Sequence, residues 1–135
     1  MLLALKNRIT ITNQLGVSRA FSATLMGKYI EASGKVLYGV IKDILASVTI
    51  GNTASGTTAT ANIHDNYLDT PYGGFAEGDV IITIAAGAAI SAGVYITVKY
   101  EVSNGDGKWA TAKTATYVVS VTDGSAESFK LTING

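Results

Sequence analysis

The segment from Asn62 to Phe75, NIHDNYLDTPYGGF, holds the only histidine and the only proline of the chain, together with two aspartates. His64 could act as a general base or a metal ligand, and Asp65 and Asp69 supply carboxylates close to it in the sequence. A hydrolase triad also needs an activated nucleophile, and no serine of the chain lies in a G-x-S-x-G turn. The segment therefore offers a base without a recognisable nucleophile, and we expect no catalytic residue in it.

A metal site is the second chemistry that these residue types allow. Zinc needs three or four His, Cys or carboxylate ligands, and the chain has one histidine and no cysteine. Calcium binds oxygen ligands in flexible geometry, so Asp65, Asn66 and Asp69 are weak calcium candidates. Their spacing departs from that of an EF-hand loop. We expect no resident metal and no other cofactor, with a calcium site at these three residues as the alternative.

A structural interpretation of the same segment competes with both chemistries. Asp, Asn, Pro and Gly are turn residues, and Pro71 has no amide hydrogen to donate within a central strand. This composition predicts a connection between strands rather than a strand. Large aromatic side chains on such a connection bury against the core or against a neighbouring subunit. The candidates for a subunit contact are Tyr67, Tyr72 and Phe75.

Other binding or catalytic sites have little support in the sequence. Glycoside hydrolysis would need carboxylates from this segment paired with Glu77 or Asp79. A carbohydrate platform would have one tryptophan, Trp109, which follows the turn NGDG and which we interpret as a packing residue of a sheet. The glycine pairs lack the lysine and the following helix of a phosphate-binding loop.

Composition narrows the functional classes further. Charged residues make up 15% of the chain, against about 25% in ordinary soluble domains. Ten basic residues balance ten acidic ones, which argues against a nucleic-acid binder because such proteins need a basic face. A net charge of zero with few charges favours association. We therefore expect a protein whose surface is largely covered in its working state.

The start of the chain, MLLALKN, predicts where the protein is made and how it contacts its neighbours. Its short apolar run before Lys6 is too brief for a signal peptide, so we expect synthesis in the cytoplasm. No apolar run approaches the roughly 18 residues of a membrane span. Leu2, Leu3 and Leu5 either pack under the protein's own sandwich or reach a neighbouring subunit, in which case residues 1–7 form an extended arm.

The elements that must position these residues are mostly strands. In YITVKYEV, Ile96, Val98 and Tyr100 alternate with polar residues at the period of a half-buried strand. Asn-Gly and Asp-Gly turns between such segments favour antiparallel pairing. The predicted strands of the second half lie within residues 79–87, 93–103, 108–124 and 127–135.

The first half is less regular. Residues 8–13, 47–51 and 57–65 are predicted strands, and residues 20–32 fit both periods but are assigned to a strand. Between residues 35 and 46, apolar residues recur at helical spacing, which predicts a short helix despite Gly39. We expect a single domain over residues 1–135, an all-β antiparallel two-sheet sandwich of jelly-roll type with about eight strands.

These observations together predict a non-enzymatic structural subunit that self-assembles. The first interpretation is a virion protein made in the host cytoplasm: a capsid, decoration, penton or tail component. The alternative is an extracellular, pilus-like filament subunit joined by strand exchange, and a carbohydrate-binding β-sandwich module is a third. The expected partners are copies of the chain, as a homo-oligomer or polymer, and other structural subunits, with no direct nucleic-acid binding and no membrane span.

Overall fold

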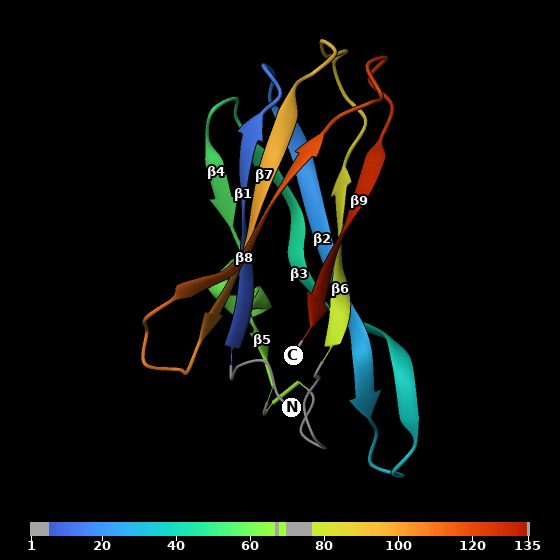
Figure 1. Ribbon diagram of the computed structural model, residues 1–135, viewed down its shortest axis with the longest axis vertical. Helices are drawn as coiled ribbons and strands as arrows, with labels where there is room; N and C mark the ends of the chain where they lie inside the picture. The colour runs from blue at the N-terminus through green and yellow to red at the C-terminus, as the bar shows by residue number, and fades with distance from the viewer. Residues whose placement is uncertain (1–5, 67, 70–76, 135) are drawn as a thin grey trace.

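The computed structural model describes residues 6–66, 68–69 and 77–134, and it is a sandwich of two antiparallel sheets (Figure 1). The first sheet has the strand order β4-β1-β7-β8, with β5 also paired to β1, and the second has the order β3-β2-β6-β9. The first sheet consists of β1 (Lys6–Gln14), β4 (Ser55–Thr57), β5 (His64–Asp65), β7 (Tyr95–Ser103) and β8 (Ala110–Val118). The second consists of β2 (Arg19–Ile30), β3 (Val36–Ile50), β6 (Glu77–Ile84) and β9 (Glu127–Asn134). A 3-10 turn, η1 (Thr60–Asn62), lies between β4 and β5.

The predicted two-sheet sandwich is confirmed, with nine strands in the described part of the chain where about eight were expected. The strand order expected from the sequence was that of a jelly roll. In the structure, β1 is an inner strand of its sheet and lies between β4 and β7. The described residues contain no helix with the length and apolar character needed to cross a membrane.

The core forms because strands of both sheets alternate apolar and polar residues. In β7, Ile96, Val98 and Tyr100 are buried while Tyr95 and Lys99 are exposed, as the sequence period predicts. The same alternation in β1 and β2 brings the inward faces of the two sheets together. The largest fully buried side chains are Tyr100, Phe21, Ile9, Ile11, Leu15, Leu25, Ile44, Leu45, Ile82, Ile84 and Ile96.

The predicted helix near residues 35–46 is wrong, because this segment belongs to the strand β3. The pairing of β3 with β2 contains three register shifts. The 15 residues of β3 therefore run beside only 12 residues of β2. Each shift adds one residue to β3, which reverses the facing of the residues that follow. Ile44 and Leu45 are therefore neighbours in sequence and both buried. Bulges of this kind turn a period of two into a pattern that resembles a helix.

The predicted strand over residues 57–65 is also largely wrong. Thr57 ends β4, and Thr58 then turns its hydroxyl inward, where it accepts a hydrogen bond from the backbone N–H of Ile9 (3.0 Å). After η1, His64 and Asp65 pair with Asn7 and Lys6 of β1. The segment that starts at Asn62 is thus not a connection throughout, since its first residues include this short strand.

The hairpin of β2 and β3 extends past the rest of its sheet. The last residue pair between β2 and β6 is Gly27 with Gly78, whereas pairing of β2 with β3 continues to Ile30 and Val36. Residues 28–38, which we call the arm, therefore have no backbone pairing with β6 and project from the sandwich at the lower right of Figure 1.

Candidate functional site

The histidine singled out from the sequence lies in a buried chain of hydrogen bonds. β5 places His64 beside Asn7 of β1, and both side chains are fully buried. Asn7 donates from Nδ2 to Nδ1 of His64 (3.1 Å), and the Tyr100 hydroxyl donates to Oδ1 of Asn7. The imidazole therefore accepts at Nδ1, which is the arrangement of a neutral ring with its proton on Nε2.

The surroundings of His64 keep it uncharged. Burial lowers the pKa of His64 to about 4; the nearby Lys42 ammonium lowers it as well, while Asp69 and Asp65 act in the opposite direction. Burial also raises the pKa of the Tyr100 hydroxyl. A general base must reach the proton that it removes. His64 is enclosed in the fold, so its geometry is that of a structural residue.

The carboxylates next to His64 are held by the protein itself. Asp69 accepts hydrogen bonds at Oδ2 from Lys42 Nζ (3.0 Å) and from the backbone N–H of Asp65 (2.8 Å). Burial opposes ionisation of Asp69, but these two hydrogen bonds and the Lys42 charge leave its pKa below the ordinary value. Asp65 accepts from the N–H of Leu68 (3.1 Å) at Oδ1. The two carboxylates are thus parts of a turn that Lys42 fastens to β3.

The alternative of a calcium site rested on Asp65, Asn66 and Asp69. The structure brings the two aspartates together, since the backbone N–H of Asp65 donates to the Asp69 carboxylate. Asn66 is almost completely buried. Within the described ranges, no three His, Cys, Asp or Glu side chains group closely enough to hold a metal ion. A cation would have to displace the Lys42 ammonium from Asp69, which opposes binding.

We expect calcium and its chelation to leave the stability unchanged. Because Lys42 already neutralises Asp69, the melting temperature in excess CaCl2 should lie within about 1 °C of that in EDTA, by the linkage between binding and stability. Differential scanning calorimetry in the two solutions measures this directly. A melting temperature that rises with calcium concentration would instead assign a cation site to this turn.

The predicted subunit-contact residues lie outside the part of the chain that the structure describes. β1 starts at Lys6, so residues 6 and 7 of the expected N-terminal arm belong to a strand. The residues outside the described ranges are Leu2, Leu3, Leu5, Tyr67, Tyr72 and Phe75.

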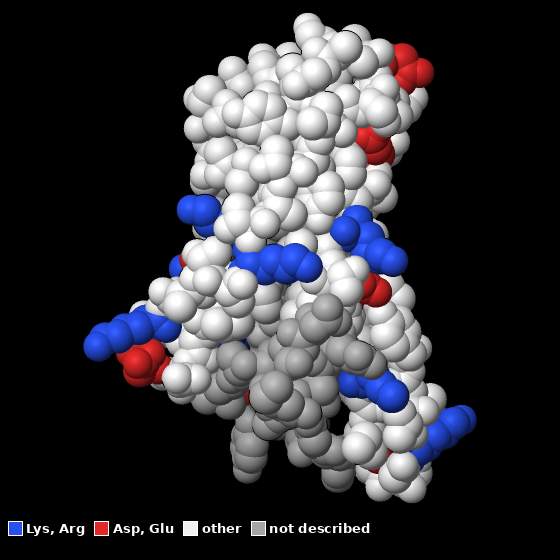
Figure 2. Space-filling view, in the orientation of Figure 1, with Lys and Arg blue, Asp and Glu red and all other residues white. Residues whose placement is uncertain are grey.

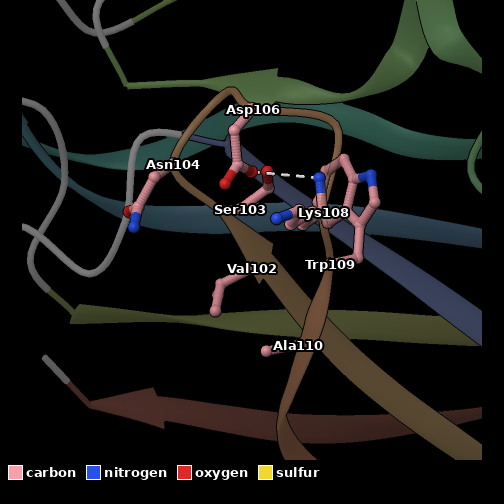
Figure 3. A pocket seen from close by; sticks show the side chains of 7 residues that line it. All are labelled: Val102, Ser103, Asn104, Asp106, Lys108, Trp109 and Ala110. Carbon is pink, nitrogen blue, oxygen red and sulfur yellow. Dashed lines mark hydrogen bonds between the residues drawn. The ribbon is translucent and has the colours of Figure 1, made fainter.

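A cavity of about 240 Å³ lies at the turn between β7 and β8 (Figure 3). Two of its polar side chains are engaged by the turn: Asp106 accepts from the N–H of Lys108 (3.0 Å), and Ser103 accepts from the N–H of Gly105 (3.1 Å). Gly105 and Gly107 adopt φ of 89° and 80°, as the NGDG sequence predicts for a tight turn. The lining contains neither a nucleophile–base pair nor a metal cluster.

Trp109, beside this cavity, is part of a packed cluster on the outer face of the first sheet. The guanidinium carbon of Arg8 lies 4.1 Å from the centre of the indole ring. Arg8 also pairs with Glu101 (3.3 Å), which accepts a second hydrogen bond from Thr10 (2.6 Å). One face of the indole is thus covered by a cation, in agreement with the interpretation of Trp109 as a packing residue.

An apolar surface on the arm and at its base was not predicted from the sequence. Seven large apolar side chains are exposed among the described residues, and four of them gather here. They form what we call the arm patch: Ile30 (39% exposed), Val36 (54%), Tyr38 (57%) and Val40 (59%). The signal was the alternation of Val36, Tyr38 and Val40, which becomes visible once the segment is assigned to a strand.

The opposite end of the sandwich carries few charges. Four loops meet there, over residues 15–18, 51–54, 85–94 and 119–126, and their only charged residue is Asp123. Figure 2 shows Lys and Arg gathered over the middle and lower parts of the visible face, with none near this end. Arg19, at the start of β2, is buried and donates to the carbonyl oxygens of Ala85 (2.8 Å) and Ala88 (2.7 Å), which fastens the longest loop.

The described residues therefore offer buried polar networks, small pockets and an exposed apolar surface. The polar groups around His64 and Arg19 make hydrogen bonds that stabilise the fold. The arm patch is left as the feature with the clearest capacity for contact, because exposed apolar clusters rimmed by polar residues mark interaction sites. Comparison with known proteins gives no further assignment, since no family model, no curated protein sequence and no solved structure matches the chain.

Proposed function

We propose that the chain is a non-enzymatic structural subunit that assembles with copies of itself. The observation that carries this proposal is the arm patch. Ile30, Val36 and Val40 expose apolar surface on a hairpin that projects from the sandwich. Scattered apolar side chains are normal on a protein surface, but a cluster on a projecting element costs solubility unless a partner covers it.

The charge distribution supports the same proposal. With 15% charged residues and no net charge, the chain has little electrostatic repulsion to keep its copies apart. The loop end with Asp123 as its only charge adds a second surface of small, mostly uncharged residues. The arm patch and this weakly charged loop end lie at opposite ends of an elongated sandwich, which suits a subunit with more than one neighbour.

Catalysis has less support than assembly. The only histidine is buried and neutral, and the carboxylates beside it are held by Lys42 and by backbone N–H groups. We therefore propose that the protein is not an enzyme.

Among structural roles we propose a virion component, such as a capsid, decoration, penton or tail protein, made in the host cytoplasm. The warrant is the combination of a small antiparallel sandwich, the low charge and the exposed arm patch, and it rests in part on analogy between folds. The alternative is an extracellular filament subunit. Electron microscopy of the assembled protein distinguishes closed or ring-shaped particles from open filaments.

We expect the purified protein to self-associate at micromolar concentration. A contact with a dissociation constant of about 1 µM, equivalent to about −8 kcal/mol, would be mostly formed at about 10 µM protein. Multi-angle light scattering during gel filtration should then give a mass above the 14.0 kDa of one chain. A single 14.0 kDa species at every accessible concentration would contradict the proposal.

A further inference from the structure

We propose that the arm patch is the surface through which two copies of the chain pair, face to face and about a two-fold axis. This inference rests on the proposed self-assembly and adds to it the residues and the symmetry of one contact. The patch belongs to the outer face of the second sheet, opposite the core.

The strand register places the patch residues on one face. Ile30 pairs with Val36 and Lys28 with Tyr38, while at the base of the arm Met26 pairs with Val40. Side chains of directly opposed residues in an antiparallel pair point to the same side of the sheet. The two strands thus present a mostly apolar strip, from Ile30 and Val36 near the tip to Met26 and Val40 at the base, with Lys28 and Tyr38 between them.

The charges that border the strip favour a second copy as its occupant. Lys28 lies exposed within the strip, on the arm side. Asp79 lies at its base, paired in register with Met26, and accepts a hydrogen bond from the Tyr38 hydroxyl (2.7 Å). Asp43 lies exposed beyond the base, on the same face, where Thr24 donates to it (3.0 Å). The arm end of the strip thus carries the basic Lys28, and its base carries the acidic Asp79, with Asp43 beyond it.

A two-fold axis matches these halves. When two such faces meet in antiparallel orientation, the tip of each arm covers the base of the other. Ile30 and Val36 of one copy then meet Met26 and Val40 of the partner, and Lys28 approaches the partner's acidic base. If the two arms were parallel instead, the Lys28 side chains of the two copies would face each other. Like charges across an interface disfavour binding, so the charges select the antiparallel arrangement.

The first experiment removes the apolar strip while leaving the monomer intact. Val36 and Val40 are more than half exposed, so Val36→Lys and Val40→Lys should each fold. We expect each to raise the dissociation constant measured by sedimentation velocity more than about tenfold, because a charge is placed within the apolar part of the contact. Val118→Lys is the matched control, since Val118 is 61% exposed on β8 of the other sheet, and it should leave the constant unchanged.

The second experiment tests whether the occupant is a copy of the chain. Lys28→Glu should weaken association, and the double variant Lys28→Glu/Asp79→Lys should restore most of it, because both halves then carry reversed charges. Circular dichroism melts verify that each variant folds. A failure of the double variant to regain affinity would reject the antiparallel pairing of copies.

The outcomes separate this inference from the proposed function. Association of the wild type that is insensitive to Val36→Lys and Val40→Lys would overturn the arm contact and leave self-assembly standing. Equal weakening by Val118→Lys would also overturn the arm contact, because the effect would then be that of added charge alone. A wild type that stays monomeric would overturn both the self-assembly and the arm contact between copies. This outcome includes the case in which the arm binds a different protein.

Discussion

Replacing Gly78 with alanine is expected to lower the free energy of unfolding by more than about 3 kcal/mol, or to prevent folding. A Cβ atom on Gly78 would lie 2.1 Å from the carbonyl oxygen of Met26 and 3.0 Å from Cα of Gly27. Both atoms belong to the backbone of β2, so no side-chain rotation relieves the overlap. The two strands would have to separate where β6 begins, and the pairing of β2 with β6 would weaken.

Gly39→Ala is a matched control for this substitution. Gly78, Gly27 and Gly39 lie in one row across β6, β2 and β3. A Cβ atom on Gly39 meets nothing within 4 Å, so the change should alter stability by less than about 1 kcal/mol. Urea denaturation followed by the fluorescence of Trp109 compares the two variants. Equal losses at both positions would contradict the steric explanation.

The glycine row also marks where the arm leaves the sandwich. Beyond Gly27 and Gly78, β2 keeps only β3 as a neighbour in the described residues. Strand pairs that project in this way are marginally stable alone, because one neighbour and solvent on the remaining sides give little burial. Contact with a second copy would supply the missing burial, which links the row to the proposed assembly surface.

The class of the fold could be predicted from the sequence because the second half has simple strands. β7 alternates without interruption from Tyr95 to Tyr100, and glycine turns separate it from its neighbours. Period and turn chemistry are local properties, so they can be read without knowledge of the partners. The order of strands in the sheets depends on contacts between distant segments, such as β1 with β7, and carries no local signal.

The first half was harder to predict because β3 is bulged. The extra residues along β3 bring Ile44 and Leu45 inward together, and Ser47 adopts a φ of 31° that no strand period anticipates. Bulges are set by the packing of β3 on β2, not by its own sequence. The same failure hid the arm patch, since a helix over residues 35–46 would place Val36 and Val40 on its core face and Tyr38 on the other side.

The candidate site was located by composition but not explained by it. A lone histidine between aspartates drew attention to His64, yet its hydrogen-bond partner Asn7 lies 57 residues earlier in the chain. Likewise, Lys42 reaches Asp69 from β3, 27 residues away. The sequence showed which groups could titrate, and only the fold shows that they are already hydrogen-bonded.

The burial of neutral His64 predicts a specific loss of stability in mild acid. Its pKa is about 4 in the folded protein and 6.5 in the unfolded chain. Between these values the unfolded state binds the additional proton, so stability is complete above about pH 6.5 and falls as the pH drops toward 4. The difference of pKa corresponds to about 3 kcal/mol. Urea denaturation between pH 8 and pH 4 should show this loss, with little change above pH 6.5.

The variant His64→Asn isolates the contribution of the imidazole. An asparagine Oδ1 can accept from Asn7 at the place of Nδ1, but it has no proton to gain in this range. The variant should be less stable than the wild type at pH 7, because it leaves a cavity, and nearly insensitive to pH between 6.5 and 4. Asp69 adds only a small loss near pH 4, where its carboxyl in the unfolded chain, with an ordinary pKa of 3.8, begins to take up protons while its pKa in the fold is lower. An identical slope in wild type and variant would show that another group causes the acid sensitivity, and a flat wild-type curve would show that His64 can be protonated without cost within the fold.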